Sequence, residues 1–316
     1  MTSLLDQSAL SNLAERLVAA ARRAGADAAD AVAVRSMSLH VGVREGAVDA
    51  SERSESDDVG LRVFVGRRTA VVSTNDIAGD VAPLAERAVA MAKVAPEDKF
   101  AGLADPAMLA KTQPDLDLLD PELPPVAVLE DRALRAEAAG LAVKGVSKSE
   151  GASASASIGG MVLVTSHGFH GAYLVSRSGF SMSAIAGEGT AMETDYDYSS
   201  ALHAADLESP EKVGRTAGER AVARLNPRKV ETTKVPIVYD KRVSSSLLGH
   251  LAGAINGSSV ARKTSFLKDK RGERLFREGI RVIDDPLRRR GQRSRPFDAE
   301  GVAGKQLALI EDGVLM

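Results

Sequence analysis

The chain has 316 residues, of which 44% are apolar, and it has no cysteine, no tryptophan and a net charge of −2. This length allows two or three domains with ordinary buried cores. The lack of cysteine excludes disulfides, thiolate metal ligands and a cysteine nucleophile, and the few aromatic residues disfavour stacking on nucleic-acid bases. The start, MTSLLDQSAL, lacks the features of a secretion signal and no apolar run has membrane-spanning length, which predicts a cytoplasmic protein.

The first hundred residues predict an α+β domain, assigned to 1–100. Leucines and alanines at three- and four-residue spacing predict a helix between Ser8 and Ala24. A second helix is expected from a cap at Asp76 to about Val94. Between the helices, alternating segments predict strands at 30–43, 47–55, 59–65 and 69–73. Helices and antiparallel strands together favour a two-layer α/β unit.

A second, β-rich domain is predicted at 126–230. It follows a stretch rich in proline and aspartate, 101–125, which is expected to be a linker or a connection along the surface. The Gly/Ser-rich alternation of 146–199, which includes SEGASASASIGG, is typical of a barrel or meander of strands with bulges. Helices are expected before and after it, at 126–144 and 210–225.

A third segment, 235–316, begins with PIVYD, which predicts a buried strand leading into a helix with the sequence SSLLGHLAGAINGSS. Gly249, Gly253 and Gly257 recur at spacing four in this helix, beside His250. Each glycine costs about 1 kcal/mol relative to alanine in a helix interior, so the close approach of another backbone is expected to compensate. A zinc-peptidase helix needs two histidines and a glutamate, and a lone His250 is better explained as a hydrogen-bonded structural residue.

The motif H167-G-F-H170 has two histidines at a spacing that suits a metal on a helix. Its neighbours, VLVTS and GAYLVS, are typical of strands. A hairpin turn with Gly168 at positive φ is therefore favoured over a metal site.

The motif S265-F-L-K268 matches the Ser-x-x-Lys pattern of serine acylases. Because the pattern has only two defined positions and its companion motifs are incomplete, a surface location without catalytic meaning is the favoured interpretation. An autonomous serine hydrolase that uses Ser265 and Lys268 stays open as an alternative.

Positive charge is concentrated between Arg262 and Arg295, where 13 Lys/Arg face 5 Asp/Glu. Five arginines within eight residues are candidate contacts for an anion or a partner: Arg288, Arg289, Arg290, Arg293 and Arg295. Acids flank this run on both sides, so pairing with carboxylates explains it as well as nucleic-acid binding does.

Two acidic motifs, D195-Y-D-Y198 and the pair Asp284 and Asp285, offer oxygen ligands for a divalent cation. Neither supplies the closely spaced oxygens of a calcium loop. Both are expected to be solvated or paired acids.

Four stretches together resemble the TldD/PmbA family, specifically its PmbA (TldE) branch, whose members have been called modulators of DNA gyrase. They are VGLRVFVGRRTAVVSTND, ERAVAMAKVAPEDKFAGLAD, SLLGHLAGAINGSSVARKTSFLKDKRGE and IDDPLRRRGQRSRPFDAEG. The resemblance runs from about Asp27 to the C-terminus. It implies a subunit of a cytoplasmic, heterodimeric zinc metallopeptidase that cleaves unfolded or flexible peptides.

The same resemblance implies that this chain lacks the metal site. The catalytic branch carries a His-Glu-x-x-x-His helix, whose three functional positions fall here on Gly249, His250 and Ala254. The family's further ligand is a cysteine, which this chain does not have. We therefore expect no catalytic residue, no metal ligand and no peptidase activity from this chain alone, with zinc held by a TldD-like partner subunit.

The resemblance also implies that the C-terminal domain is incomplete, since family members extend beyond the equivalent of Met316. When the partner is missing, a homodimer is the alternative assembly. An extended peptide substrate is expected on an exposed strand edge of the Gly/Ser-rich meander. The alternative is a regulatory protein that binds a DNA-associated target, such as gyrase, through 288–295; no membrane partner is expected.

Overall fold

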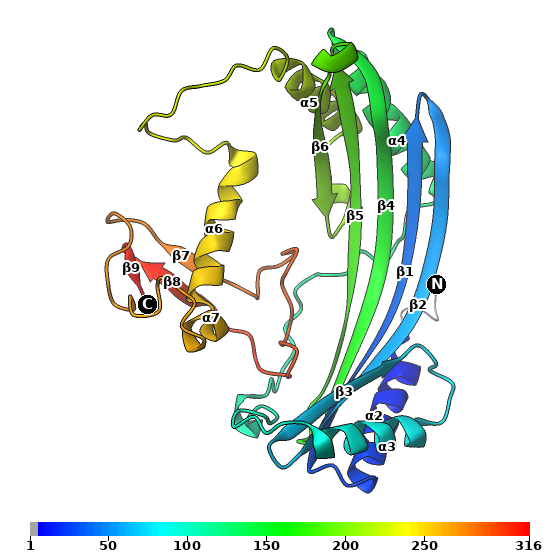
Figure 1. Cartoon of the computed structure of the whole chain (residues 1–316). Coiled ribbons are helices and arrows are strands. Elements are labelled where there is room, and N and C mark those ends of the chain that lie inside the picture. The colour runs from blue at the N-terminus through cyan, green and yellow to red at the C-terminus, as the bar shows by residue number, and fades with distance from the viewer. Residues whose placement is uncertain (1–5) are drawn as a thin grey trace. The chain divides into compact units, whose positions relative to one another are not determined.

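The computed structural model describes residues 6–316, so the first five residues of the expected N-terminal domain lie outside the described part of the chain. The chain forms two compact units (Figure 1). One unit consists of Met1–Pro227 and Pro286–Gly304, and the other of Arg228–Asp285 and Lys305–Met316. The chain therefore leaves the first unit, returns to it for one segment, and ends in the second.

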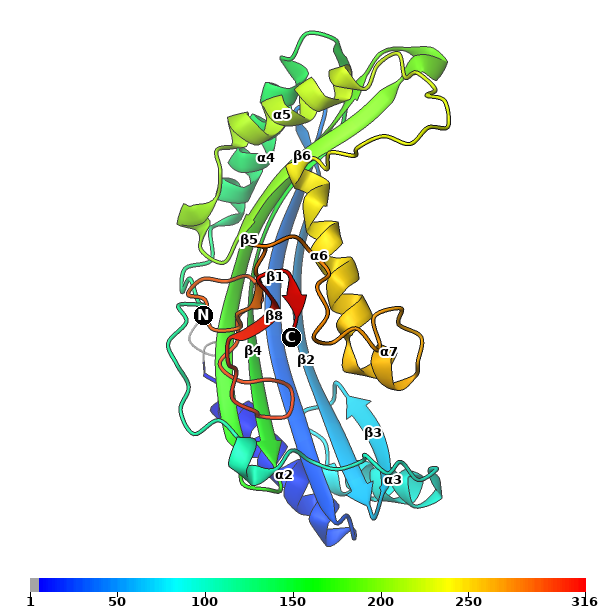
Figure 2. The same ribbon diagram turned by 90° about the vertical axis from the view of Figure 1, so that its left-hand side faces the viewer.

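A curled antiparallel sheet of six strands dominates the first unit, in the order β3-β2-β1-β4-β5-β6 (Figure 2). The strands are β1 (Ala28–Arg44), β2 (Ala47–Val65), β3 (Arg68–Thr74), β4 (Val146–Thr165), β5 (His170–Ala186) and β6 (Glu193–Ala201). β1 pairs with β4 in the middle, so strands from the first and second halves of this unit build one sheet. The expected α+β fold with a barrel-like, β-rich part is confirmed.

The Gly/Ser-rich alternation is explained by β4, which has both neighbours in the sheet. Ala152, Ala154 and Ala156 are at most 4% exposed and face the core. The serines between them lie on the opposite face, because successive side chains of a strand point to opposite sides. Small alternating residues thus mark a central strand with one covered face.

Two pairs of helices cover the same face of the sheet. Odd-numbered residues of β1 contact both pairs: Ala31 and Ala33 belong to the core under the first pair, and Met37 and Leu39 to the core under the second. The pairs are α2 (Ser8–Arg23) with α3 (Val81–Val94), and α4 (Val126–Leu141) with α5 (Pro210–Ala223) (Figure 1). We call the opposite face of the sheet, which carries the serines of β4, the open face.

The closest helix packing occurs between α4 and α5. A Cβ atom at Gly214 would lie 1.9 Å from the carbonyl oxygen of Ala136, and one at Gly218 would lie 2.8 Å from that of Gly140. Such distances are far below van der Waals contact, so only glycine permits this approach. A buried carboxylate on α4 adds a polar contact, since Glu137 accepts hydrogen bonds from the backbone N–H groups of Glu45 at 3.0 Å and Gly46 at 2.7 Å.

Two sequence-based predictions in this unit were wrong in detail. The segments 47–55 and 59–65 form one continuous strand, because β1 is long enough to pair with all of β2. The second helix begins after Asp80, whose side chain caps it by accepting from the N–H of Ala82. Asp76 instead accepts from the N–H groups of Ala78 and Gly79 and so stabilises the preceding turn.

The proline-rich stretch before α4 lies along the sheet. Leu116 and Leu118 are buried against Leu202. The N–H of Ser176 on β5 donates to the carbonyl of Leu118 at 3.0 Å. This stretch therefore contributes to the core of the first unit.

The second unit contains α6 (Lys241–Ile255), α7 (Gly257–Ala261) and a small antiparallel sheet. Its strands are β7 (Val282–Asp284), β8 (Leu307–Glu311) and β9 (Val314–Leu315). Leu251, Ile310 and Leu315 form its buried core. The predicted buried strand PIVYD is wrong: it is not in a strand, and Val238 is 93% exposed.

None of the helices within residues 6–316 is both long and apolar enough to cross a membrane.

Candidate functional site

Helix α6 carries the three positions that correspond to the expected metal motif. Its first turn is capped by Asp240, which accepts from the N–H of Arg242 at 2.8 Å. Gly249 and His250 are exposed, and Ala254 is half-buried. The hydroxyl of Ser265 donates to the carbonyl of Ala254 at 2.5 Å and ties the end of the helix to the following loop.

The donor atoms around α6 do not fit a zinc ion. Glycine and alanine have no ligating side-chain atom, and a tetrahedral zinc site needs at least three protein ligands. Within residues 6–316, no group of three or more His, Asp or Glu side chains is placed to hold a metal. His250 thus stands as a single imidazole on an exposed helix face.

No backbone of the described residues of this chain approaches the glycine stripe of α6. A Cβ atom at Gly249, Gly253 or Gly257 would meet no described heavy atom within 4 Å. Gly257 also lies outside α6, because Asn256 ends that helix and caps α7. The four-residue spacing therefore does not identify a packed stripe here.

Ser265 and Lys268 are not arranged as a catalytic pair. The expected surface location is wrong for Ser265, which is 7% exposed and whose hydroxyl donates to the carbonyl of Ala254. The ammonium group of Lys268 pairs with Asp269. Because the serine hydroxyl donates to a carbonyl and the lysine pairs with a carboxylate, Lys268 does not activate Ser265 as a nucleophile in this arrangement.

The two histidines of H167-G-F-H170 flank the turn between β4 and β5. Gly168 has φ +90°, as expected for a hairpin turn. His167 contacts the carbonyl of Ala104 at 3.4 Å, whereas His170 contacts Ser11 at 3.2 Å. The prediction of a turn is confirmed, and the rings have separate partners.

The arginine run divides into two parts. Arg290 bonds Asp117 at 2.7 Å and Asp206 at 2.9 Å, and Arg289 lies 3.3 Å from Asp117. The bond from Arg290 holds the pKa of Asp117 below its ordinary value. These two arginines therefore form a clasp within the first unit, whereas Arg293 and Arg295 lie further along the loop and face a different hollow.

The acidic motifs are engaged by cations or amides, as expected. Asp197 bonds Arg220 at 2.7 Å, and the buried Asp195 lies 3.4 Å from Arg224. In the second unit, Asp285 accepts from Gln306 at 3.1 Å. The chemistry is that of structural ion pairs and hydrogen bonds.

A buried charge cluster near one end of the sheet is also structural. Arg62 bonds Asp30, its direct partner across β1 and β2, and reaches Glu300 at 3.0 Å. Burial raises the pKa of Asp30 above its ordinary value, although Arg62 acts in the opposite direction. The cluster anchors the segment that follows the arginine run to the sheet.

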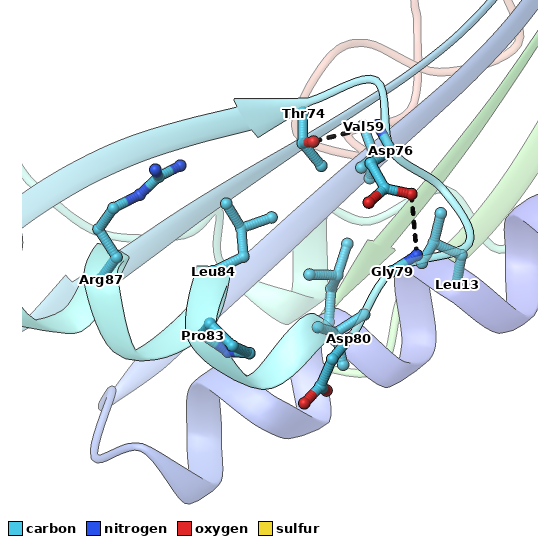
Figure 3. A pocket seen from close by; sticks show the side chains of 11 residues that line it. Leu13, Val59, Thr74, Asp76, Gly79, Asp80, Pro83, Leu84 and Arg87 are labelled. Carbon is cyan, nitrogen blue, oxygen red and sulfur yellow. Dashed lines mark hydrogen bonds between the residues drawn. The ribbon is translucent and has the colours of Figure 1, made fainter.

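A cavity of about 360 Å³ lies between α2, α3 and the strands beside them (Figure 3). Leu13, Leu17 and Leu84 form part of its apolar lining. Its two acids, Asp76 and Asp80, already accept hydrogen bonds from backbone N–H groups. It therefore offers no free carboxylate for acid-base chemistry.

Two features escaped sequence reasoning. Among residues 6–316, no strand pairs with the outer edge of β2 from Ala47 to Asp58, because β3 pairs only with residues 59–65. Arg177 of β5 joins Arg293 and Arg295, more than a hundred positions later, around one hollow. Neither feature has a local sequence signal, because each depends on which strands and loops become neighbours.

Three family models match consecutive parts of the chain. Residues 29–92 match domain 1, residues 119–225 the central domain and residues 232–316 the C-terminal domain of the PmbA/TldA metallopeptidases. Together the matches cover most of the chain.

Curated relatives agree with these matches. The metalloprotease PmbA of Escherichia coli O157:H7 is 34% identical over 92% of this chain, and a PmbA homologue of Haemophilus influenzae is 35% identical over 93%. The aligned region spans 65% and 66% of those two relatives, respectively.

Solved structures share the fold. A Bacteroides thetaiotaomicron protein, described as a candidate modulator of DNA gyrase, has a TM-score of 0.90 and 26% identity, covering 96% of this chain and 70% of its own. TldE from Thermococcus kodakarensis has a TM-score of 0.74 at 18% identity, covering 96% of this chain and 68% of its own.

Proposed function

This chain belongs to the PmbA/TldD metallopeptidase family, and we propose that within it the chain is a non-catalytic, TldE-like subunit. It would pair with a TldD-like subunit that supplies the zinc and carries out hydrolysis of unfolded or flexible peptides. Its own role would be to complete the complex and hold an extended peptide. The proposal includes a cytoplasmic location, which cell fractionation would test.

The donor chemistry of α6 carries this proposal. At the positions of the family's metal motif, Gly249 and Ala254 have no side-chain ligand atom, and in the part of the chain that the structure describes no group of three or more metal-binding side chains includes His250. Metal-assisted peptide hydrolysis needs both a metal with an open coordination position and a general base. The chain supplies neither at α6.

The unpaired edge of β2 supports the peptide-holding role. Adding a peptide to a free strand edge satisfies backbone groups on both sides and requires little side-chain identity. The previously expected edge, in the Gly/Ser-rich meander, is less accessible. β4 is internal, and on β6 the carbonyls of Tyr196 and Ser200 accept from Arg220 and Gln292.

The β2 edge also has an apolar neighbour and a definite charge. A hollow of about 500 Å³ beside it is lined by Met37 and Leu39 of β1, Ser51–Arg53 of the edge, and Leu123 to Val126. Five acids and one arginine lie in 47–58, which gives a net charge of −4. This charge favours basic peptides and opposes edge-to-edge pairing with a second copy.

The first experiment compares the isolated chain with a reconstituted complex. Purified alone, the chain should hold no stoichiometric zinc by elemental analysis and should not cleave an unstructured peptide. Mixed with a family member that carries the His-Glu-x-x-x-His motif, it should form a complex that cleaves the peptide. His250→Ala should leave that activity unchanged.

Tightly bound zinc in the isolated chain, lost in His250→Ala together with peptide cleavage, would overturn the proposal. A homodimer of the isolated chain, measured by light scattering, is compatible with it if the catalytic partner displaces the second copy.

The second experiment tests the β2 edge with an alternating lysine-valine decapeptide and the isolated chain. Glu52→Lys with Glu55→Lys should weaken binding by roughly tenfold, since each exposed charge contributes up to about 1 kcal/mol. Glu219→Lys, an exposed change on α5, is the matched control. Full N-methylation of the peptide should abolish binding because it removes the pairing N–H groups; unchanged affinity would exclude strand addition.

Binding to a DNA-associated target through 288–295 is the competing function. The pairing of Arg289 and Arg290 with acids of the same unit disfavours it. A DNA affinity that falls steeply with salt and is lost in Arg289→Ala with Arg290→Ala would favour it instead.

A further inference from the structure

A hollow of about 330 Å³ in the first unit brings together three arginines from distant parts of the sequence. Arg177 lies on β5, and Arg293 and Arg295 lie on the loop 288–295. The other lining residues are Tyr173, Val175, Gln292 and Ser294. No carboxylate lines the hollow, so its walls carry three positive charges without a negative one.

This lack of counter-charge distinguishes the three arginines from others in the same unit. Arg135 bonds Glu211 and Arg220 bonds Asp197, each at 2.7 Å. Across residues 6–316, by contrast, the ion pairs of the structure include none of the three arginines around the hollow. Like charges around one hollow repel one another, and a bound anion would relieve that repulsion.

The backbone that carries these arginines is well anchored. Arg177 donates to the carbonyl of Gln292 at 2.9 Å, and the Gln292 amide donates to the carbonyl of Ser200 at 2.7 Å. After Arg295, Phe297 is fully buried and packs edge-on against Phe169 at 5.0 Å between ring centroids. A ligand would therefore meet an ordered loop, which lowers the entropic cost of binding.

The hollow also offers neutral hydrogen-bond donors. Tyr173 packs against Phe297 with its ring centroid at 5.4 Å. Burial raises the pKa of Tyr173, while the charge of Arg295 acts in the opposite direction. The phenol therefore stays protonated at neutral pH, so Tyr173 and Ser294 each bring a hydroxyl-bearing side chain to the lining of the hollow.

We propose that Arg177, Arg293 and Arg295 form a binding site for an oxyanion, either a carboxylate or a phosphate. The planar guanidinium fork matches both groups and can donate two hydrogen bonds to one of them. Arg177, Val175 and Tyr173 lie at alternate positions of β5 whose partners are Ser157, Gly159 and Met161 of β4, so the site borders the open face. It is separate from the β2 edge and does not depend on the proposed catalytic partner.

The test is calorimetric titration of the full chain at low salt with three probes. They are inorganic phosphate, an N-acetylated tripeptide with a free C-terminal carboxylate, and the same tripeptide as its amide. We expect phosphate, the peptide acid or both to bind at the millimolar level or tighter, and the amide not to bind. Binding of only one probe identifies the source of the oxyanion.

Variants decide whether the binding belongs to this hollow. Arg177→Gln and Arg295→Gln should each weaken binding at least about fivefold, and Arg295→Lys should weaken it less, because it keeps the charge and loses the fork. Arg215→Gln, an exposed change on α5, is the matched control and should have no effect. No binding of either anion, or equal losses in Arg215→Gln and Arg295→Gln, would overturn the proposal.

Discussion

The helix pair α4–α5 and the helix α6 both carry glycines at four-residue spacing, but their surroundings differ. In α5, Gly214 and Gly218 lie so close to α4 that a Cβ atom would overlap its backbone. In α6, Gly249 and Gly253 have no described atom within 4 Å of an added Cβ. The same spacing thus accompanies close packing in one region and an uncovered surface in the other.

The comparison shows that glycine spacing allows close helix packing but does not cause it. Small residues at spacing four allow a backbone to approach a helix, but another element must arrive at that face for the approach to occur. α4 reaches α5 because both cover the same strands of the sheet. For α6, only Leu251 is buried, so the glycine face is left for the proposed subunit pairing.

The largest loss of unfolding free energy is expected for Gly214→Ala. The added methyl group would overlap the carbonyl oxygen of Ala136, and overpacking of this kind costs about 3 kcal/mol of unfolding free energy. Urea unfolding followed by circular dichroism would measure it. A loss below about 0.5 kcal/mol would mean that α4 and α5 are further apart in solution.

A smaller loss is expected for Glu137→Gln. The buried carboxylate accepts from two backbone N–H groups of the β1–β2 turn, whereas an amide has only one acceptor oxygen and would present its NH₂ group to the other N–H. The loss in unfolding free energy should be about 2 kcal/mol. Glu130→Gln on the same helix is the control, and equal losses would contradict this role.

In α6, replacing glycine is expected to raise the free energy of unfolding rather than lower it. Gly249→Ala and Gly253→Ala should each stabilise the chain by about 0.5–1 kcal/mol, because alanine lowers the conformational entropy of the unfolded chain and no atom opposes the methyl group. The same unfolding assay applies. Destabilisation of the isolated chain would show a covered stripe, whereas weaker pairing with the partner alone would place that partner on the stripe.

The smallest expected effect on stability is the pH-dependent contribution of Asp117, which is bonded by Arg290 in the clasp. Its pKa is lowered mainly by the hydrogen bond from Arg290, so the contribution to stability is complete above the ordinary value near 3.8 and is lost as pH falls through the lower folded value. Carboxyl chemical shifts during an acid titration would report this pKa. Arg290→Gln should raise it toward its ordinary value, and an unchanged pKa would argue against the clasp.

Much of the first unit could be predicted because its signals are local. The helix near Ser8 follows apolar periodicity, and the hairpin turn at Gly168 needs positive φ. The continuity of β2 could not be predicted, since the polar residues 56–58 separate two alternating segments and are held in the strand by their pairing with 34–36 of β1. The segment PIVYD shows the reverse. Its apolar composition predicted a strand, but it forms none because no neighbouring strand pairs with it among the described residues.

For the candidate site, too, some features could be predicted from the sequence and others could not. The sequence by itself determined that Gly249 and Ala254 cannot bind a metal, because ligand chemistry belongs to the residue type. It also determined which residues carry charge. Only the tertiary structure decided that Arg290 bonds Asp117 while Arg295 and Arg177 line one hollow, and that β2 keeps an edge unpaired by any described strand. The physical reason is that a side chain's charge and its ligand atoms are properties of one residue, whereas electrostatic environment and strand pairing depend on which distant segments the fold makes neighbours.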